Sequence, residues 1–82
     1  MGKLTAKQLQ KQKLINSQEY TILVTLRKLT KPVSNRALVS LVSMPINVVT
    51  PRMNSLRRKL LVEPAGRVYD QETNRTVQVW TA

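Results

Sequence analysis

Four basic residues, Arg52, Arg57, Arg58 and Lys59, lie within eight positions of one another, with an asparagine and a serine between them. Arginine and asparagine side chains can each form paired hydrogen bonds with base edges in the major groove of DNA. Lysine, serine and further arginine side chains commonly bind phosphate oxygens. These residue types therefore suit a partner that is negatively charged and rich in hydrogen-bonding groups, provided that they share one surface.

The apolar residues of the same stretch have a helical spacing. Val49, Met53, Leu56 and Leu60 follow one another at intervals of four, three and four positions. This spacing predicts a helix with one apolar stripe, from which the polar and basic residues point away. On a helical wheel the opposite arc holds Pro51, Asn54, Ser55 and Arg58, with Thr50, Arg52 and Lys59 at its flanks.

Each side chain on that arc suggests a contact. Arg58 and Asn54 are the expected base readers, because they point furthest from the apolar stripe and match guanine and adenine edges. Thr50 and Ser55 are short donors for phosphates or base edges, and the helix N-terminus near Thr50 adds partial positive charge. The flanking basic residues suit the phosphate backbones on either side of a groove. The full expected set is Arg36, Asn47, Thr50, Pro51, Arg52, Asn54, Ser55, Arg57, Arg58, Lys59, Arg67 and Arg75. The alternative is an ordinary helix with a solvated basic face.

The charge of the whole chain favours a polyanionic partner. The net charge is +10 over 82 residues, a balance typical of nucleic-acid binding. Residues 1–62 carry twelve positive charges against one acid, Glu19, for a net +11, whereas residues 63–82 carry a net −1. The anion-facing surface is therefore expected in the first three quarters of the chain.

The composition argues against several other classes of protein. The chain has no cysteine and no histidine, so disulfides, thiol nucleophiles, imidazole bases and the usual zinc ligands are ruled out. The four acids are scattered and there is no glycine-rich phosphate loop, so we expect no enzyme and no cofactor. No apolar run approaches the roughly 18 residues that a bilayer span requires, and we expect a cytoplasmic protein. Only 4% of the residues are aromatic, which disfavours single-strand binding by base stacking.

The helices that must position these residues have clear starts. Residues 1–15 are predicted to be a basic N-terminal arm or helix, with Thr5 as its cap and Lys3, Lys7 and Lys11 on one face. It is either a loosely helical solvated tail, a basic arm that adds phosphate contacts, or a short dimerising helix. A helix follows Asn16, which with Glu19 forms a capping box. A second helix follows Ser34, with Ala37, Leu38, Leu41 and Val42 turned inward, and ends before Pro45. The basic helix is predicted to run from about Asn47 or Thr50 to Leu60 or Leu61, with Pro51 in its first turn.

After residue 66 the period of the apolar residues changes to two. Val68 in one segment, and Val77 and Val79 in the next, alternate with polar residues, and "QETN" between them supplies turn residues. Asn74 can adopt the left-handed conformation that such a turn requires. We expect a β-hairpin packed on the helices through its valines, with Tyr20, Tyr69 and Trp80 as packing residues.

The order helix, helix, turn, basic helix, hairpin is that of a winged helix-turn-helix. The stretch "INVVTPRMNSLRRKLLVEPAGRVYDQETNRTVQVW" resembles the winged-helix domains of bacterial repressors, and is most similar to small helix-turn-helix proteins of bacteriophages and prophages. The resemblance covers residues 17–80 and implies a mainly α domain over residues 16–82 with a small β-hairpin as its wing. The family usually has glycine at the position of Leu60, so the basic helix is expected to run further here.

The favoured hypothesis is a sequence-specific double-stranded DNA-binding protein, a transcriptional regulator of phage or mobile-element origin that acts on the nucleoid. A module of this size buries a limited area on DNA, so a homodimer on a repeated site is expected. Two alternatives stay open: a winged-helix module that binds an acidic surface of a host transcription or replication protein, and a DNA-architectural or recombination accessory factor.

Overall fold

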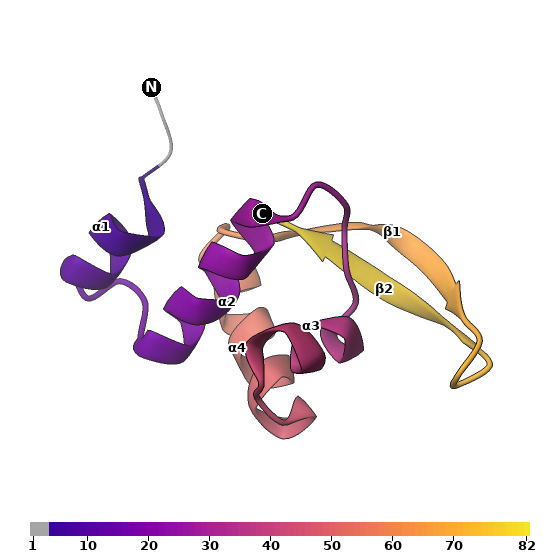
Figure 1. Ribbon diagram of the computed structural model, residues 1–82. Helices are drawn as coiled ribbons and strands as arrows, with labels where there is room; N and C mark the ends of the chain where they lie inside the picture. The colour runs from indigo at the N-terminus through magenta and orange to yellow at the C-terminus, as the bar shows by residue number, and fades with distance from the viewer. Residues whose placement is uncertain (1–3) are drawn as a thin grey trace.

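The structure is a computed structural model that describes residues 4–82. In this part of the chain four helices precede a two-stranded antiparallel hairpin (Figure 1). The elements are α1 (Ala6–Lys11), α2 (Ser17–Lys28), α3 (Asn35–Val42), α4 (Ile46–Arg58), β1 (Glu63–Asp70) and β2 (Arg75–Thr81). α2, α3 and α4 gather at one end, α1 stands beside α2, and the hairpin projects away from the helices.

The predicted helix caps are present. Thr5 and Asn16 each accept a hydrogen bond from the backbone N–H three residues on, and Gln8 and Glu19 return a side-chain bond to the cap residue, so both helices begin with a capping box. The hydroxyl of Ser34 accepts from the N–H of Ala37 at the start of α3. These starts were predictable because a cap needs only residues close together in sequence.

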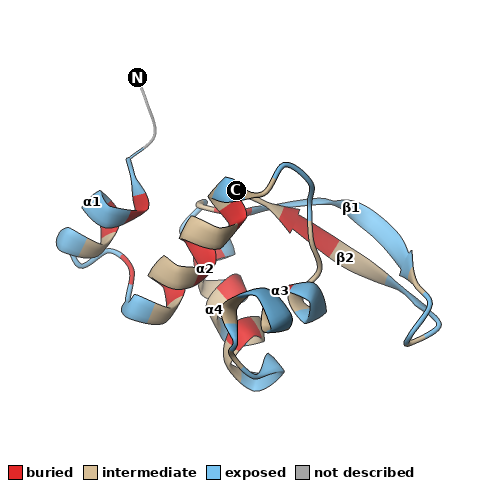
Figure 2. Ribbon diagram, viewed as in Figure 1, coloured by how far each residue is buried: buried red, intermediate tan, exposed pale blue. Residues whose placement is uncertain are grey.

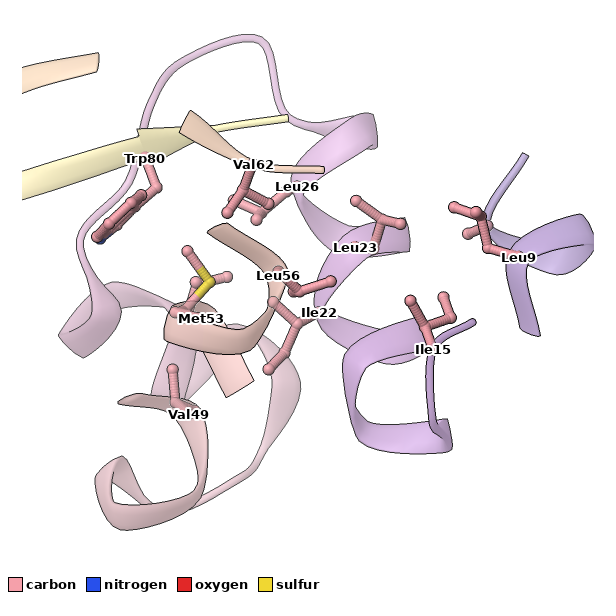
Figure 3. Close-up of a cluster of buried hydrophobic side chains, with 12 residues drawn as sticks. Leu9, Ile15, Ile22, Leu23, Leu26, Val49, Met53, Leu56, Val62 and Trp80 are labelled. Carbon is pink, nitrogen blue, oxygen red and sulfur yellow. The ribbon is translucent and has the colours of Figure 1, made fainter. Parts of the chain in front are cut away.

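One hydrophobic cluster joins the four helices to the base of the hairpin (Figures 2 and 3). Leu23 and Leu26 of α2 and Met53 and Leu56 of α4 are buried, and Trp80 of β2 closes the cluster beside them. Burial of each such side chain contributes roughly 1.5–3 kcal/mol to folding. Val49, Met53 and Leu56 of α4 are therefore buried as expected and fix which face of that helix points outward, but the prediction of a buried Leu60 is wrong, because the helix ends at Arg58 and Leu60 is 90% exposed.

α1 differs from the solvated-tail interpretation. Ala6 and Leu9 of α1 are buried in the same cluster as Leu23, and the Arg27 guanidinium donates from α2 to the carbonyl of Leu4 at 2.6 Å. A short amphipathic helix gains its stability from such tertiary packing rather than from its own propensity. The solvated-tail reading is therefore wrong for residues 6–11. Lys3, expected on its basic face, lies outside the described residues.

α3 is less buried than predicted. Leu38 is fully buried and Val42 is partly buried, but Ala37 is exposed and Leu41 is 52% exposed. α3 has only 8 residues, so one narrow stripe suffices to hold it against α4. The expectation that all four of the apolar residues named for this helix point inward is therefore wrong for Ala37 and Leu41.

The bounds of α4 also differ from expectation. The helix begins at Ile46, so Pro51 lies in its interior and not in its first turn. It ends at Arg58, where the N–H of Leu60 donates to the Arg57 carbonyl and the N–H of Leu61 to the Leu56 carbonyl. Leu60 has a φ of 61°, the left-handed conformation usually taken by glycine at this position of a helix end. The prediction that the helix runs further is therefore wrong: leucine replaces glycine without extending the helix.

The hairpin is attached to the helices at its base. Trp80 of β2 exchanges two backbone hydrogen bonds with Val33, at 2.8 and 3.1 Å, in the loop between α2 and α3. Asn74 in the hairpin turn has a φ of 55°, as predicted. Val79 and Trp80 are buried, but Val68 and Tyr69 on β1 are 49% and 58% exposed, so the valines and aromatic residues pack only near the base. The expected packing role of Tyr69 is therefore wrong.

Candidate nucleic-acid interface

Four side chains form a continuous exposed line along α4. Asn47, Pro51, Asn54 and Arg58 follow one another at intervals of four, three and four residues, on the face opposite the buried Val49, Met53 and Leu56. All four are exposed, and within residues 4–82 none of them makes a side-chain hydrogen bond or an ion pair with another side chain. We call this line the outer stripe. Its polar groups are available to a partner.

Three further residues of α4 that were expected to contact DNA are turned toward α2. Arg52 Nε donates to Gln18 Oε1 at 2.7 Å, and the Ser55 hydroxyl donates to Glu19 Oε2 at 2.8 Å. Lys59 Nζ lies 2.9 and 2.8 Å from the two carboxylate oxygens of Glu19. We call Arg52, Ser55 and Lys59 the inner flank. Its residues fix the helix to its neighbour, so the basic helix has one side that binds inward and one that stays free.

Glu19 is the centre of this arrangement. Its side chain is only 3% exposed, and its carboxylate accepts hydrogen bonds from Lys59, from Ser55 and from the backbone N–H of Asn16. Burial raises the pKa of Glu19, but the bonds from Lys59, Asn16 and Ser55 and the charge of Lys59 outweigh burial and hold its pKa below the ordinary 4.5. A buried carboxylate with this many donors is a fixed anchor for α4.

The sequence predicted only half of the role of Glu19. Its place three residues after Asn16 indicated the capping box, which involves local bonds alone. Its bonds with Ser55 and Lys59 span 36 and 40 positions of the chain, and no local pattern fixes such a pairing. A signal was present, however, since Glu19 is the only acid among the first 62 residues of a strongly basic chain.

The remaining expected residues of α4 are less free than the outer stripe. The guanidinium of Arg57 lies 5.5 Å from the ring centroid of Trp80, a cation–π geometry. Thr50 is half-buried. The Arg57 side chain therefore connects α4 to Trp80 at the base of the hairpin.

Arg36 and the hairpin form a second, mixed-charge region. Arg36 Nη2 lies 3.7 Å from Glu72 Oε2 in the hairpin turn, and both side chains are well exposed. Arg75 pairs across the hairpin with Asp70, while Arg67 is exposed opposite Gln78. Glu72 in the turn thus offsets the charge of Arg36, and Asp70 stands opposite Arg75 in the strand register. The structure does not bring these residues onto the outer stripe.

Comparisons with known proteins leave the family open. No protein-family model matches the chain, and no curated protein matches it significantly in sequence. Between residues 4 and 82 no group of three or more acidic side chains is placed to hold a metal ion. No helix in that part of the chain is long and apolar enough to cross a bilayer.

Proposed function

We propose that the protein is a winged helix-turn-helix protein that binds double-stranded DNA with sequence preference, and that α4 is its recognition helix. The order of the elements supports this proposal. α3 and α4 are joined by a short turn, and the hairpin follows α4 directly. The bridge between Val33 and Trp80 adds a third strand position to the hairpin, between α2 and α3, as in the sheet of a winged helix.

The observation that carries the proposal is the outer stripe. From Asn47 to Arg58 it extends about 17 Å along the helix axis, at 1.5 Å per residue. An α-helix fits the major groove of B-DNA, which is about 12 Å wide, so a stripe of this length can place several side chains against base edges. Asn54 and Arg58 are its bidentate groups: we assign Asn54 to adenine, where its amide would donate to N7 and accept from N6, and Arg58 to guanine, where its guanidinium would donate to O6 and N7.

The inner flank supports the same proposal indirectly. A base-reading side chain must be held within a fraction of an ångström of its position, which requires a rigid supporting element. The bonds of Ser55 and Lys59 with the buried Glu19 provide that support from the side of α4 that faces α2. The transcriptional role follows as the simplest use of such a module, and a phage or mobile-element origin follows from the resemblance described above.

The test is selection of bound sequences from a random duplex pool, performed with the wild type, Arg58→Ala and Asn54→Ala. We expect the wild type to enrich a motif and Arg58→Ala to lose preference at one guanine position, with about a 10- to 100-fold loss of affinity for the selected site. Lys28→Ala is the matched control, because it removes one exposed positive charge at the end of α2 and should weaken all sequences equally.

The salt dependence of binding separates specific recognition from a general attraction to polyanions. The logarithm of the affinity should fall linearly with the logarithm of the salt concentration, with a slope of about −0.9 per phosphate contact. If binding is salt-dependent but no motif is enriched, or if Arg58→Ala keeps the motif of the wild type, the assignment of α4 as the reading helix is wrong. In the first case an architectural role becomes the better explanation.

A further inference from the structure

Pro51 is the one residue of the outer stripe whose side chain has an unusual place in its helix. It is the sixth residue of α4, past the first position where a helix readily accepts proline, and it has no N–H to donate to the carbonyl of Asn47. Its ring is exposed, so packing within residues 4–82 does not explain its presence. Residues that break a local rule of folding without an internal gain are often functional, so Pro51 points to a contact outside the chain.

The ring of Pro51 differs in chemistry from the rest of the outer stripe. Asn47 and Asn54 carry amides and Arg58 carries a guanidinium, all of which form hydrogen bonds, whereas a proline ring exposes only carbon. The base edges in the major groove present hydrogen-bond donors and acceptors, together with one apolar group, the C5-methyl of thymine, which apolar side chains contact. Within a major groove, thymine is therefore the base that matches Pro51.

We propose that Pro51 is a specificity-determining residue that packs its ring against the C5-methyl group of a thymine. The inference rests on the proposed function and deepens it, because it names the kind of DNA that α4 reads. Amides suit adenine and the guanidinium suits guanine, so three residues of the outer stripe favour A·T pairs and only Arg58 favours a G·C pair. The site read by α4 should therefore be A·T-rich, with a guanine at the end contacted by Arg58.

The spacing along the helix sets the order of these base pairs. From Pro51 to Asn54 the helix rises about 4.5 Å, and from Asn54 to Arg58 about 6 Å. Base pairs follow one another at about 3.4 Å. With α4 lying along the groove, the thymine of Pro51 lies one or two pairs from the adenine of Asn54, and the guanine of Arg58 lies about two pairs beyond that adenine on the other side.

The experiment removes the methyl group from the DNA and the ring from the protein. In the motif that the wild type selects, each thymine is replaced in turn by deoxyuracil, which lacks the methyl group and keeps the pairing with adenine. The Kd of each duplex is measured by fluorescence anisotropy at one salt concentration. We expect one substitution, on the side of the adenine away from the guanine, to weaken binding about fourfold, the effect of one buried methyl group.

Pro51→Gly supplies the second half of the comparison. Glycine has no side chain and is less unfavourable than proline inside a helix, so α4 is retained. This variant should bind the thymine and uracil duplexes equally. Pro32→Gly is the matched control, because it alters an exposed proline in the loop between α2 and α3, and it should keep the fourfold ratio. Any loss of folded protein cancels in that ratio, since one protein sample binds both duplexes.

The outcomes separate this inference from the proposed function. If the wild type selects a motif but no thymine in it is sensitive to loss of the methyl group, or if Pro51→Gly keeps that sensitivity, the role of Pro51 is overturned and α4 remains a reading helix. A sensitive thymine on the guanine side of the adenine would likewise contradict the predicted order. If no motif is enriched at all, the proposed function fails and this inference fails with it.

Discussion

The two polar sides of α4, the inner flank and the outer stripe, both carry basic residues but have different roles. The donors of the inner flank bind α2, and Ser55 and Lys59 are hydrogen-bonded to the buried Glu19. The outer stripe has one basic residue and two amides, and its side chains make no side-chain hydrogen bond within residues 4–82. This difference shows that charge alone does not tell which residues of a basic helix contact a nucleic acid. It should also be measurable, because the inner flank ought to govern stability and the outer stripe recognition.

The largest effect should come from breaking the inner flank at its centre. Glu19→Ala removes a buried carboxylate, its bonds with Ser55 and Lys59, and one half of the capping box of α2. The Lys59 side chain is 37% exposed, so the effect comes mainly from the lost bonds of the buried carboxylate, roughly 1.5–3 kcal/mol, and from the lost half of the cap, about 1 kcal/mol. A total of about 3 kcal/mol corresponds to a fall in Tm of roughly 12–24 °C for a domain of this size. Thermal unfolding followed by circular dichroism measures this shift.

Glu63→Ala is the matched control for Glu19→Ala, because it removes an acid that is exposed on β1. Its Tm should change by less than a few degrees, since exposed substitutions usually alter stability by under about 0.5 kcal/mol. At a temperature where Glu19→Ala is still folded, it should select the same DNA motif as the wild type. A Glu19→Ala variant as stable as the wild type would show that the inner flank is not an anchor.

A smaller effect, of opposite sign, is expected on the outer stripe. Pro51 lies inside α4, where it cannot donate to the carbonyl of Asn47, and a proline in a helix interior costs about 3 kcal/mol. Pro51→Ala should therefore stabilise the protein, by about 2 kcal/mol after allowance for the greater freedom of the unfolded chain. Urea unfolding gives the change, and DNA selection shows whether the proline shapes the reading surface.

The comparison for Pro51→Ala is Pro32→Ala, in the loop between α2 and α3. There the substitution frees the unfolded chain without repairing a helix, so stability should fall slightly or stay the same. If Pro51→Ala instead destabilises the protein, the outer stripe contributes to folding as well as to recognition, and the contrast between the two sides of α4 is weaker than we infer.

The smallest of these effects should come from lowering the pH, which acts on the inner flank through Glu19 and not on the outer stripe. The pKa of Glu19 lies below 4.5 in the folded protein, so its contribution to stability is fully present above 4.5 and is lost as the pH falls through the folded pKa. Glu19→Gln carries no titrating group at this position. Its free energy of unfolding should therefore fall less steeply than that of the wild type between about pH 5 and pH 2, and parallel curves would argue against a special role for this carboxylate.

The local features of the fold could be predicted from the sequence. Thr5, Asn16 and Ser34 cap their helices, Val49, Met53 and Leu56 of α4 are buried at the expected spacing, and Asn74 is left-handed in its turn. Each of these depends on residues within a few positions of one another, where backbone geometry and short side-chain bonds decide the outcome. The outward placement of Asn54 and Arg58 could be predicted in the same way, because the helical period alone sets it. The net charge of the chain follows directly from its composition.

The tertiary structure decided everything that depends on distant parts of the chain. It turned Ser55 and Lys59 toward Glu19, docked α1 through Leu9, and left Leu60 exposed beside a hollow. A lysine can bind a phosphate or a buried carboxylate equally well, and only the packing of α2 against α4 puts the carboxylate within reach. The sequence thus determined which residues could contact a partner, and the packing of the helices determined which of them are free to do so.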